Sequence, residues 1–130
     1  MERQTQLVRN FIESDLEIVN HWLHRRGQAP ITLDLVPKHG LIAPNAVGFI
    51  YQTDASVAIL DMFVTNKDAP LKDRTTDLEE IATSLISGSN NRLIMATTKH
   101  PAILRLLKLN NFIQLDHTCH IRGISNENYK

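Results

Sequence analysis

Residues 56–81, SVAILDMFVTNKDAPLKDRTTDLEEI, join an apolar run to the start of a helix. The first part predicts a buried strand, because residues 57–64 are apolar on both faces except at Asp61. The second part predicts a helix, because its apolar side chains recur at helical spacing, at Leu71, Leu78, Ile81, Ala82, Leu85 and Ile86. The stretch is therefore a strand that leads directly into a helix.

A strand followed by a helix N-terminus is a common place for phosphate to bind. The first N–H groups of a helix lack partners, and the helix dipole attracts anions. The first turns of this helix nevertheless carry four acidic residues, Asp73, Asp77, Glu79 and Glu80. The sequence thus raises the question of whether a phosphorylated ligand is bound here at all.

The segments on the N-terminal side predict a strand, a helix and a meander. Residues 5–11 are compatible with a strand, and residues 13–27 predict an amphipathic helix with Ser14 as N-cap and Gly27 just past its end. Three apolar runs follow, separated by turn signals at Pro44-Asn45 and Asp54-Ala55: residues 41–43, 46–52 and 56–65. Connections this short require antiparallel neighbours.

The C-terminal side predicts a strand at residues 92–98, a helix at residues 100–111 and a closing strand at residues 112–123. Asn110-Asn111 suit the left-handed position at the helix end. The whole order predicts an α+β fold, an α/β sandwich with a mixed, largely antiparallel sheet flanked by helices. We expect the strand at 57–64 to be central and to splay from the strand at 92–98, which leaves a cleft between them.

Composition limits the classes of function. The chain has 130 residues, with 14 basic and 14 acidic side chains, so we expect one domain, 1–130, and no general attraction to nucleic acid or membranes. Cys119 is the only cysteine, which excludes an internal disulfide and suits a reducing compartment. The N-terminus lacks an apolar signal region and no window is long and apolar enough to span a membrane, so we expect a cytoplasmic protein.

Two segments resemble the GNAT superfamily of N-acetyltransferases, and the order of elements extends the resemblance over nearly the whole chain. Residues 57–66, VAILDMFVTN, resemble the strand that leads into the coenzyme A site. Residues 100–112, HPAILRLLKLNNF, resemble the family pattern N-x-x-A-x-x-L-Y-x-x-x-G-F, with Leu106 at the Leu and Asn111 at the Gly. The chain looks especially like short, divergent members from bacteria and phages, and a phage-encoded one would act in the host cytoplasm.

The resemblance implies acetyl-CoA as cofactor and a small-molecule or protein amine as substrate; it leaves a homodimer open. The chain departs from the family at its usual tyrosine, often the acid that protonates the departing thiolate, which falls on Leu107. The family's cofactor loop, Q/R-x-x-G-x-G/A, falls on Arg74 with Asp77 and Glu79 in place of glycines. Each carboxylate would repel a nearby pyrophosphate by roughly 1 to 3 kcal/mol unless it points away, as the outer helical arcs of both residues suggest. We therefore expect acetyl-CoA binding that is weakened or lost.

Candidate site residues follow from the residues and from the resemblance together. Strand alternation places Asp61 on one face of its strand with Val57, Ile59 and Phe63. A carboxylate in such an apolar run needs a partner or becomes a base that works near neutral pH, so Asp61 is the predicted catalytic base. His120, or alternatively His117, is the predicted acid or base in place of the missing tyrosine, and Tyr51 and Tyr129 are further phenol donors. The predicted cofactor-binding residues are Val64, Thr65, Asn66, Lys72, Arg74, Thr75, Thr76 and His100.

We expect no metal site in DHTCH, residues 116–120. Strand alternation sends His117 and Cys119 to one face and His120 to the other. Two functions stay open from the sequence: an acetyl-CoA-dependent N-acyltransferase, and a catalytically degenerate GNAT-fold binding or regulatory module that acts through protein contacts. A different α+β scaffold is the third alternative.

Overall fold

The computed structural model describes residues 7–98, 101–114 and 119–123. Its strands are β1 (Arg9–Asn10), β2 (His39–Ala43), β3 (Ala46–Gln52), β4 (Val57–Thr65), β5 (Leu93–Thr97), β6 (Ile113–Gln114) and β7 (Cys119–Gly123). Its helices are α1 (Leu16–Arg25), α2 (Leu71–Ser87) and α3 (Pro101–Leu109), with short 3-10 helices η1 (Glu13–Asp15) and η2 (Leu33–Leu35).

The strands form one seven-stranded sheet in the order β1-β2-β3-β4-β5-β7-β6. Neighbouring strands are antiparallel except β4 and β5, which are parallel and are joined through α2. The expected mixed, largely antiparallel sheet with a central β4 is therefore confirmed. The expected single closing strand at 112–123 is wrong, because the structure has two antiparallel strands there, β6 and β7.

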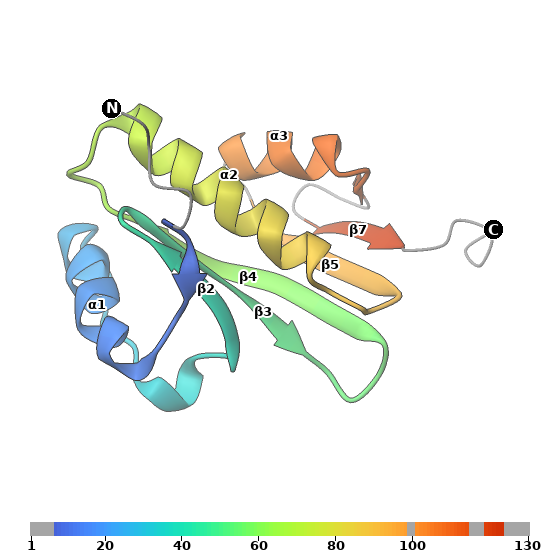
Figure 1. Ribbon diagram of the computed structural model, residues 1–130, viewed down its shortest axis with the longest axis horizontal. Helices are drawn as coiled ribbons and strands as arrows, with labels where there is room; N and C mark the ends of the chain where they lie inside the picture. The colour runs from blue at the N-terminus through green and yellow to red at the C-terminus, as the bar shows by residue number, and fades with distance from the viewer. Residues whose placement is uncertain (1–6, 99–100, 115–118, 124–130) are drawn as a thin grey trace.

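Helices cover both faces of the sheet (Figure 1). On one face, α2 and α3 bury an apolar cluster that includes Leu60, Ile81 and Leu107. On the other face, Trp22 of α1 and Phe49 of β3 belong to a second cluster. Burying each large apolar side chain stabilises the fold by about 1.5 to 3 kcal/mol, so the two clusters hold the three layers together.

Two helix ends were predicted correctly from residue chemistry. Gly27 and Asn111 both have left-handed backbones, with φ of 71° and 67°. Beyond each, the next N–H reaches back to the helix: Gln28 donates to the Leu23 carbonyl and Phe112 to the Leu107 carbonyl, both at 2.9 Å. These bonds satisfy helical carbonyls that would otherwise lack donors.

The start of the first helix differs from the expectation. Ser14 is not an N-cap, since it lies within η1, which precedes α1. Asp15 instead accepts hydrogen bonds from the Ile12 N–H at 2.9 Å and from Arg9, at 2.7 and 2.8 Å. The Arg9 guanidinium lowers the pKa of this carboxyl, and the Ile12 bond lowers it further. An ion pair with β1 therefore replaces the predicted serine cap.

Candidate functional site

A cleft opens where β4 and β5 stop pairing. Their last paired residues are Leu60 and Ala96, although β4 continues to Thr65. The cleft has a volume of about 220 Å³. Its lining includes Asp61, Val64 and Thr65 from β4, Thr97 at the end of β5, and Thr98 just after it. The splay expected between the two strands is present, and it exposes one edge of β4 to a ligand.

A bulge in β4 shapes the wall of this cleft. Val47 pairs with Val64 and Phe49 with Asp61, so Gly48 alone faces the two residues between them, Met62 and Phe63. Met62 has a φ of 61°, a left-handed value that is rare outside glycine. Strand alternation predicted Asp61 and Phe63 on one face, and the extra residue makes this wrong, because Phe63 packs against the α2 and α3 cluster.

The bulge also depends on Gly48. A Cβ atom at this position would lie 2.5 Å from the Phe63 ring and 3.0 Å from Ile81. Only glycine therefore lets the Phe63 ring lie over β3. Met62, the other bulge residue, packs with the α1 cluster. The two residues of the bulge thus point to opposite layers and bend β4 at the point where the cleft begins.

Asp61 lies on the wall of the cleft with an exposed side chain. Its carboxylate accepts a hydrogen bond of 2.7 Å from the Met62 N–H, so the bulge orients it. Tyr51 on β3 lies nearby: burial raises the pKa of its phenol, and the Asp61 carboxylate raises it further. Tyr51 therefore stays protonated at neutral pH, and its hydroxyl is 3.9 Å from the Met62 sulfur. A carboxylate and a proton-bearing phenol thus lie together on β3 and β4.

A second compartment of about 120 Å³ continues from the cleft to the start of α2. It is lined by Arg26, Thr65, Leu71, Arg74, Thr75 and Leu78. Arg26, Thr65 and Leu78 also line the cleft, so the two compartments meet at these side chains. The α2 helix begins with Leu71 and Lys72, whose N–H groups have no intrahelical acceptor, whereas those of Asp73 and Arg74 reach the Pro70 carbonyl.

Some of the predicted cofactor-binding residues line the cleft or the second compartment, and others line neither. Thr65, Arg74 and Thr75 line the second compartment, and Val64 lines the cleft. Arg74 donates to the Lys67 carbonyl at 3.2 Å. The other predicted residues line neither compartment: Asn66 donates its N–H to the Asn45 carbonyl, the Thr76 hydroxyl donates to the Lys72 carbonyl, and the exposed Lys72 side chain lies outside both.

Arg26 is a site residue that sequence reasoning missed. It follows α1 directly, and its guanidinium donates to both the carbonyl, at 3.1 Å, and the hydroxyl of Thr65. Arg25 beside it forms two hydrogen bonds to Asp68, at 2.8 and 2.9 Å, and lowers the pKa of that carboxyl. These contacts fasten the end of α1 to the loop between β4 and α2. The signal in the sequence is the Arg25-Arg26 pair before Gly27, which also fits an ordinary solvated helix end.

Asp77 and Glu79 of α2 are bonded to groups outside the two compartments. Asp77 is only 3% exposed, so its expected place on an outer arc is wrong. Its carboxylate accepts a hydrogen bond of 3.0 Å from the Asn45 N–H in the turn between β2 and β3. Glu79 forms an ion pair of 2.9 Å with Arg105 on α3. Neither carboxylate lines the path from the cleft to the start of α2.

Of the predicted site histidines, the structure describes only His120. His120 is 1% exposed and pairs with Ala96 across β5 and β7, and it is not among the residues that line the cleft. Its burial does not favour a role as acid or base. His100 and His117 lie outside the described residues, as does Tyr129. Leu107, at the family's tyrosine position, is fully buried in the α2 and α3 cluster.

The chain has the fold of the GNAT superfamily of N-acetyltransferases, as the sequence resemblance suggested. A GNAT-family N-acetyltransferase from Escherichia coli, in complex with coenzyme A, matches with a TM-score of 0.64 and 8% identity over 98% of this chain and 87% of that one. A GNAT acetyltransferase from Brucella melitensis, in complex with acetyl-CoA, matches with a TM-score of 0.63 and 8% identity over 91% and 87%.

An aminoglycoside acetyltransferase in complex with coenzyme A is also similar, with a TM-score of 0.61 and 17% identity over 90% of this chain and 94% of that one. No protein-family model matches the chain, and no curated protein matches its sequence significantly. At these identities the similarity establishes the fold. Separately, none of the helices within the described ranges has the length and apolar character that a bilayer crossing requires.

Proposed function

We propose that the chain binds acetyl-CoA in the cleft between β4 and β5, which we call the fork, and transfers the acetyl group to an amine. One observation carries the proposal: the fork continues, through Arg26, Thr65 and Leu78, into the compartment at the start of α2. A ligand with a narrow thioester arm and an anionic end fits such a path. Solved GNAT structures with coenzyme A and acetyl-CoA share the fold, which supports the same kind of ligand here.

The residues at the start of α2 suit a pyrophosphate despite the missing glycines. Arg26 and Arg74 are two cations that line the compartment, and the N–H groups of Leu71 and Lys72 have no helical acceptor. Charge-assisted bonds from such groups are about twice as strong as neutral ones. We infer that side-chain cations supply here what glycine-rich backbone supplies in the usual loop.

Asp61 and Tyr51 are the proposed proton carriers. When bound, acetyl-CoA would supply an acetyl group activated as a thioester. Asp61 would take the proton that the substrate amine loses as its nitrogen replaces the sulfur on the acetyl group. Tyr51 is the only tyrosine among the described residues. It lies beside Asp61, outside the residues that line the cleft, and it keeps a proton that it would give to the sulfur through a water molecule. His120 stays a weaker candidate because it is buried.

A GNAT-fold binding module is the second candidate, and two observations favour it. Leu107 is a core residue without a proton to give. Arg26 already occupies the Thr65 carbonyl, a backbone acceptor that an extended ligand along β4 would need. In this alternative the fold acts through protein contacts and the fork holds no cofactor.

Calorimetric titration of coenzyme A and acetyl-CoA separates the two candidates. The enzyme predicts binding at micromolar to millimolar concentration and acetylation of at least one amine in a panel of aminoglycosides, polyamines and N-terminal peptides. Asp61→Asn should keep cofactor binding and lose transfer. Absence of heat and of any melting shift at millimolar coenzyme A would replace the enzyme with the binding module.

A further inference from the structure

A large cavity lies away from the fork, at the other end of α2. It has a volume of about 810 Å³, within the range of about 300 to 1,000 Å³ that small-molecule sites occupy. Its walls come from β1, β2 and the end of β3 on one side, and from the last turns of α2 and the α2–β5 loop on the other. We call it the Asn91 groove and define it by His39, Gln52, Leu85, Ser89, Asn90 and Asn91.

The Asn91 groove is separate from the fork and its extension. The groove shares no lining residue with either compartment. Arg74 and Leu85 both lie on α2, and at 1.5 Å per residue they are about 17 Å apart along the helix axis. A ligand of ordinary size in the groove therefore does not touch the proposed cofactor, and the inference does not rest on the proposed function.

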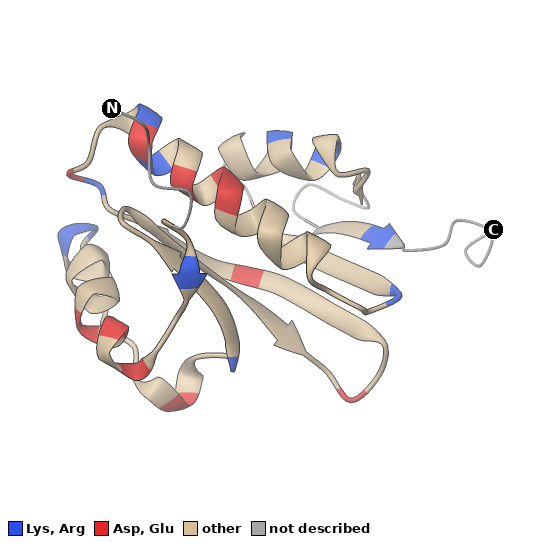
Figure 2. Ribbon diagram, in the orientation of Figure 1, with Lys and Arg blue, Asp and Glu red and all other residues tan. Residues whose placement is uncertain are grey.

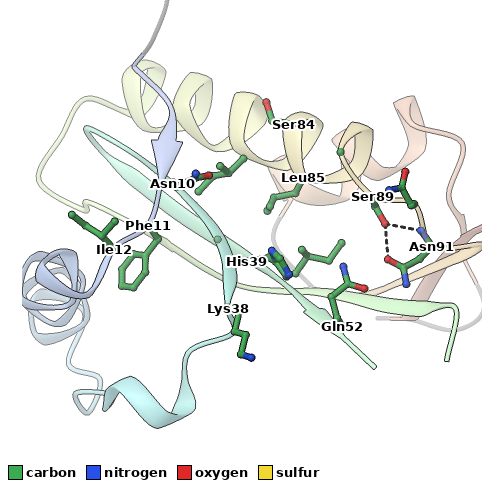
Figure 3. Close-up of a pocket in the computed structure, with 15 residues that line it drawn as sticks. Asn10, Phe11, Ile12, Lys38, His39, Gln52, Ser84, Leu85, Ser89 and Asn91 are labelled. Atoms are coloured by element: carbon green, nitrogen blue, oxygen red, sulfur yellow. Dashed lines mark hydrogen bonds between the residues drawn. The ribbon is translucent and has the colours of Figure 1, made fainter. Parts of the chain in front are cut away.

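Polar groups without charge dominate the groove. Figure 3 shows Gln52 at the end of β3 and Ser89 and Asn91 in the α2–β5 loop around it. The Ser89 hydroxyl donates to the Asn91 side-chain oxygen at 2.9 Å and accepts from the Asn91 N–H at 3.2 Å. These two bonds hold the Asn91 amide in place and leave its NH₂ group to donate to a ligand.

The charges around the groove are few and lie on one bank. Lys38 and His39 are its only ionisable lining residues, and no acidic side chain lines it in the described part of the chain. On the opposite bank, residues 81–87 at the C-terminal end of α2 include no charged residue (Figure 2). The carbonyls at this helix end present a partial negative charge. The α2 side of the groove would therefore repel a carboxylate. An ammonium would be repelled by Lys38 on the opposite side, where no carboxylate is present to bind it.

We propose that the Asn91 groove binds a neutral, hydroxyl-rich ligand, namely a saccharide. A hydroxyl group both donates and accepts, so it can satisfy the helix carbonyls and the Asn91 amide on one bank and the Gln52 amide on the other. The floor suits the carbon face of a sugar ring, since the lining also includes the apolar side chains of Leu41, Ile50 and Leu85. The Asn91 groove thus combines one fixed planar amide with an apolar floor.

Nuclear magnetic resonance titration with trisaccharides of matched size tests the proposal. The neutral probes are maltotriose, cellotriose and the N-acetylglucosamine trimer; the anionic probe is trigalacturonate and the cationic probe is the glucosamine trimer. At least one neutral probe should shift the backbone amides of Gly40, Gly88 and Asn91 at millimolar concentration, with Thr65 and Arg74 unmoved. Shifts from a charged probe alone, shifts centred on the fork, or no shift from any neutral probe at 20 mM would overturn it.

Two glutamine variants give a matched comparison. Gln52→Ala removes an exposed amide at the groove, and Gln114→Ala removes an exposed amide on β6, outside it. Loss of one hydrogen bond to the ligand should weaken binding about 3- to 10-fold in the first variant and leave the second unchanged. Lys38→Met, which removes the charge and keeps much of the length, should change neutral-sugar affinity less than 3-fold. Equal affinities of wild type and Gln52→Ala, or a loss of 3-fold or more in Lys38→Met, would contradict the neutral-ligand assignment.

Discussion

Replacement of Arg74 by alanine should weaken coenzyme A binding without disturbing the fold. The Arg74 side chain is half-buried in the compartment at the start of α2, and it makes one long hydrogen bond, 3.2 Å, to the Lys67 carbonyl. Most of its donors therefore remain for a ligand. A charge-assisted bond to a phosphate contributes a net of about 1.5 to 3 kcal/mol. A unit charge pair at about 5 Å with an effective dielectric near 20 gives a similar value, about 3 kcal/mol.

The expected change is thus a 10- to 100-fold rise in the Kd of coenzyme A. Calorimetry should compare wild type, Arg74→Ala and the control Arg105→Ala, which removes an exposed arginine on α3 that pairs with Glu79 outside the compartment. Each protein should be titrated with coenzyme A and with pantetheine, which has the thiol arm but no phosphate. Arg74→Ala should lose affinity for coenzyme A alone, and the control should lose none.

Two results would refute this reasoning. An unchanged coenzyme A affinity in Arg74→Ala would mean that the phosphates do not lie at the start of α2. An equal loss for pantetheine would mean that Arg74 acts through the shape of the loop and not through charge. Melting temperatures decide whether the variant is folded, and we expect a decrease of less than about 4 °C, since only one weak bond is removed.

Three further predictions address the buried and paired side chains. Asp77→Ala should lower stability by about 2 kcal/mol and Tm by about 6 to 10 °C, and should not improve coenzyme A affinity; improved affinity in calorimetry would show that Asp77 does oppose the cofactor. Asp61→Asn should lower the pKa of the Tyr51 phenol, measured by ultraviolet titration with Tyr51→Phe as the assignment control. An unchanged pKa would show that the Asp61 carboxylate does not act on the phenol. Asp15→Asn should cost about 1 kcal/mol at pH 7, because Arg9 holds the pKa of Asp15 below its unfolded value. In urea unfolding this difference should shrink as the pH falls below the unfolded value of 3.8 and vanish once the pH is below the lowered folded pKa of Asp15. A difference that persists when Asp15 is protonated in both states would mean that the ion pair with Arg9 is not its source.

The sequence predicted the parts of the fold that depend on local chemistry. Short turns between apolar runs require an antiparallel meander, and the structure has one at β2, β3 and β4. Gly27 and Asn111 were predicted as helix ends because few residues accept a left-handed backbone, and both have one. Such positions are decided within a few residues, so a single sequence carries the necessary information.

Side-chain directions that depend on distant contacts were not predictable. A helical wheel assigned Asp77 to an outer arc because the apolar stripe defined the inner one, but a turn 32 residues earlier supplies an N–H that satisfies the buried carboxylate. Alternation placed Asp61 and Phe63 together because nothing in the strand itself announces an extra residue. The bulge follows from Gly48 on the neighbouring strand, which makes room for the Phe63 ring.

These same long-range contacts bear on the question that the acidic start of α2 raises. The estimate from the sequence assumed that Asp77 and Glu79 repel a pyrophosphate, because the family pattern has glycine at both positions. In the structure, the Asp77 carboxylate accepts a hydrogen bond from the β2–β3 turn and the Glu79 carboxylate is paired with Arg105 on α3. Both partners lie outside the compartment at the start of α2. The charges that do line the compartment, Arg26 and Arg74, are both positive. The local field therefore favours an anion, and the loss of the glycines removes close backbone approach without adding a negative charge to the path.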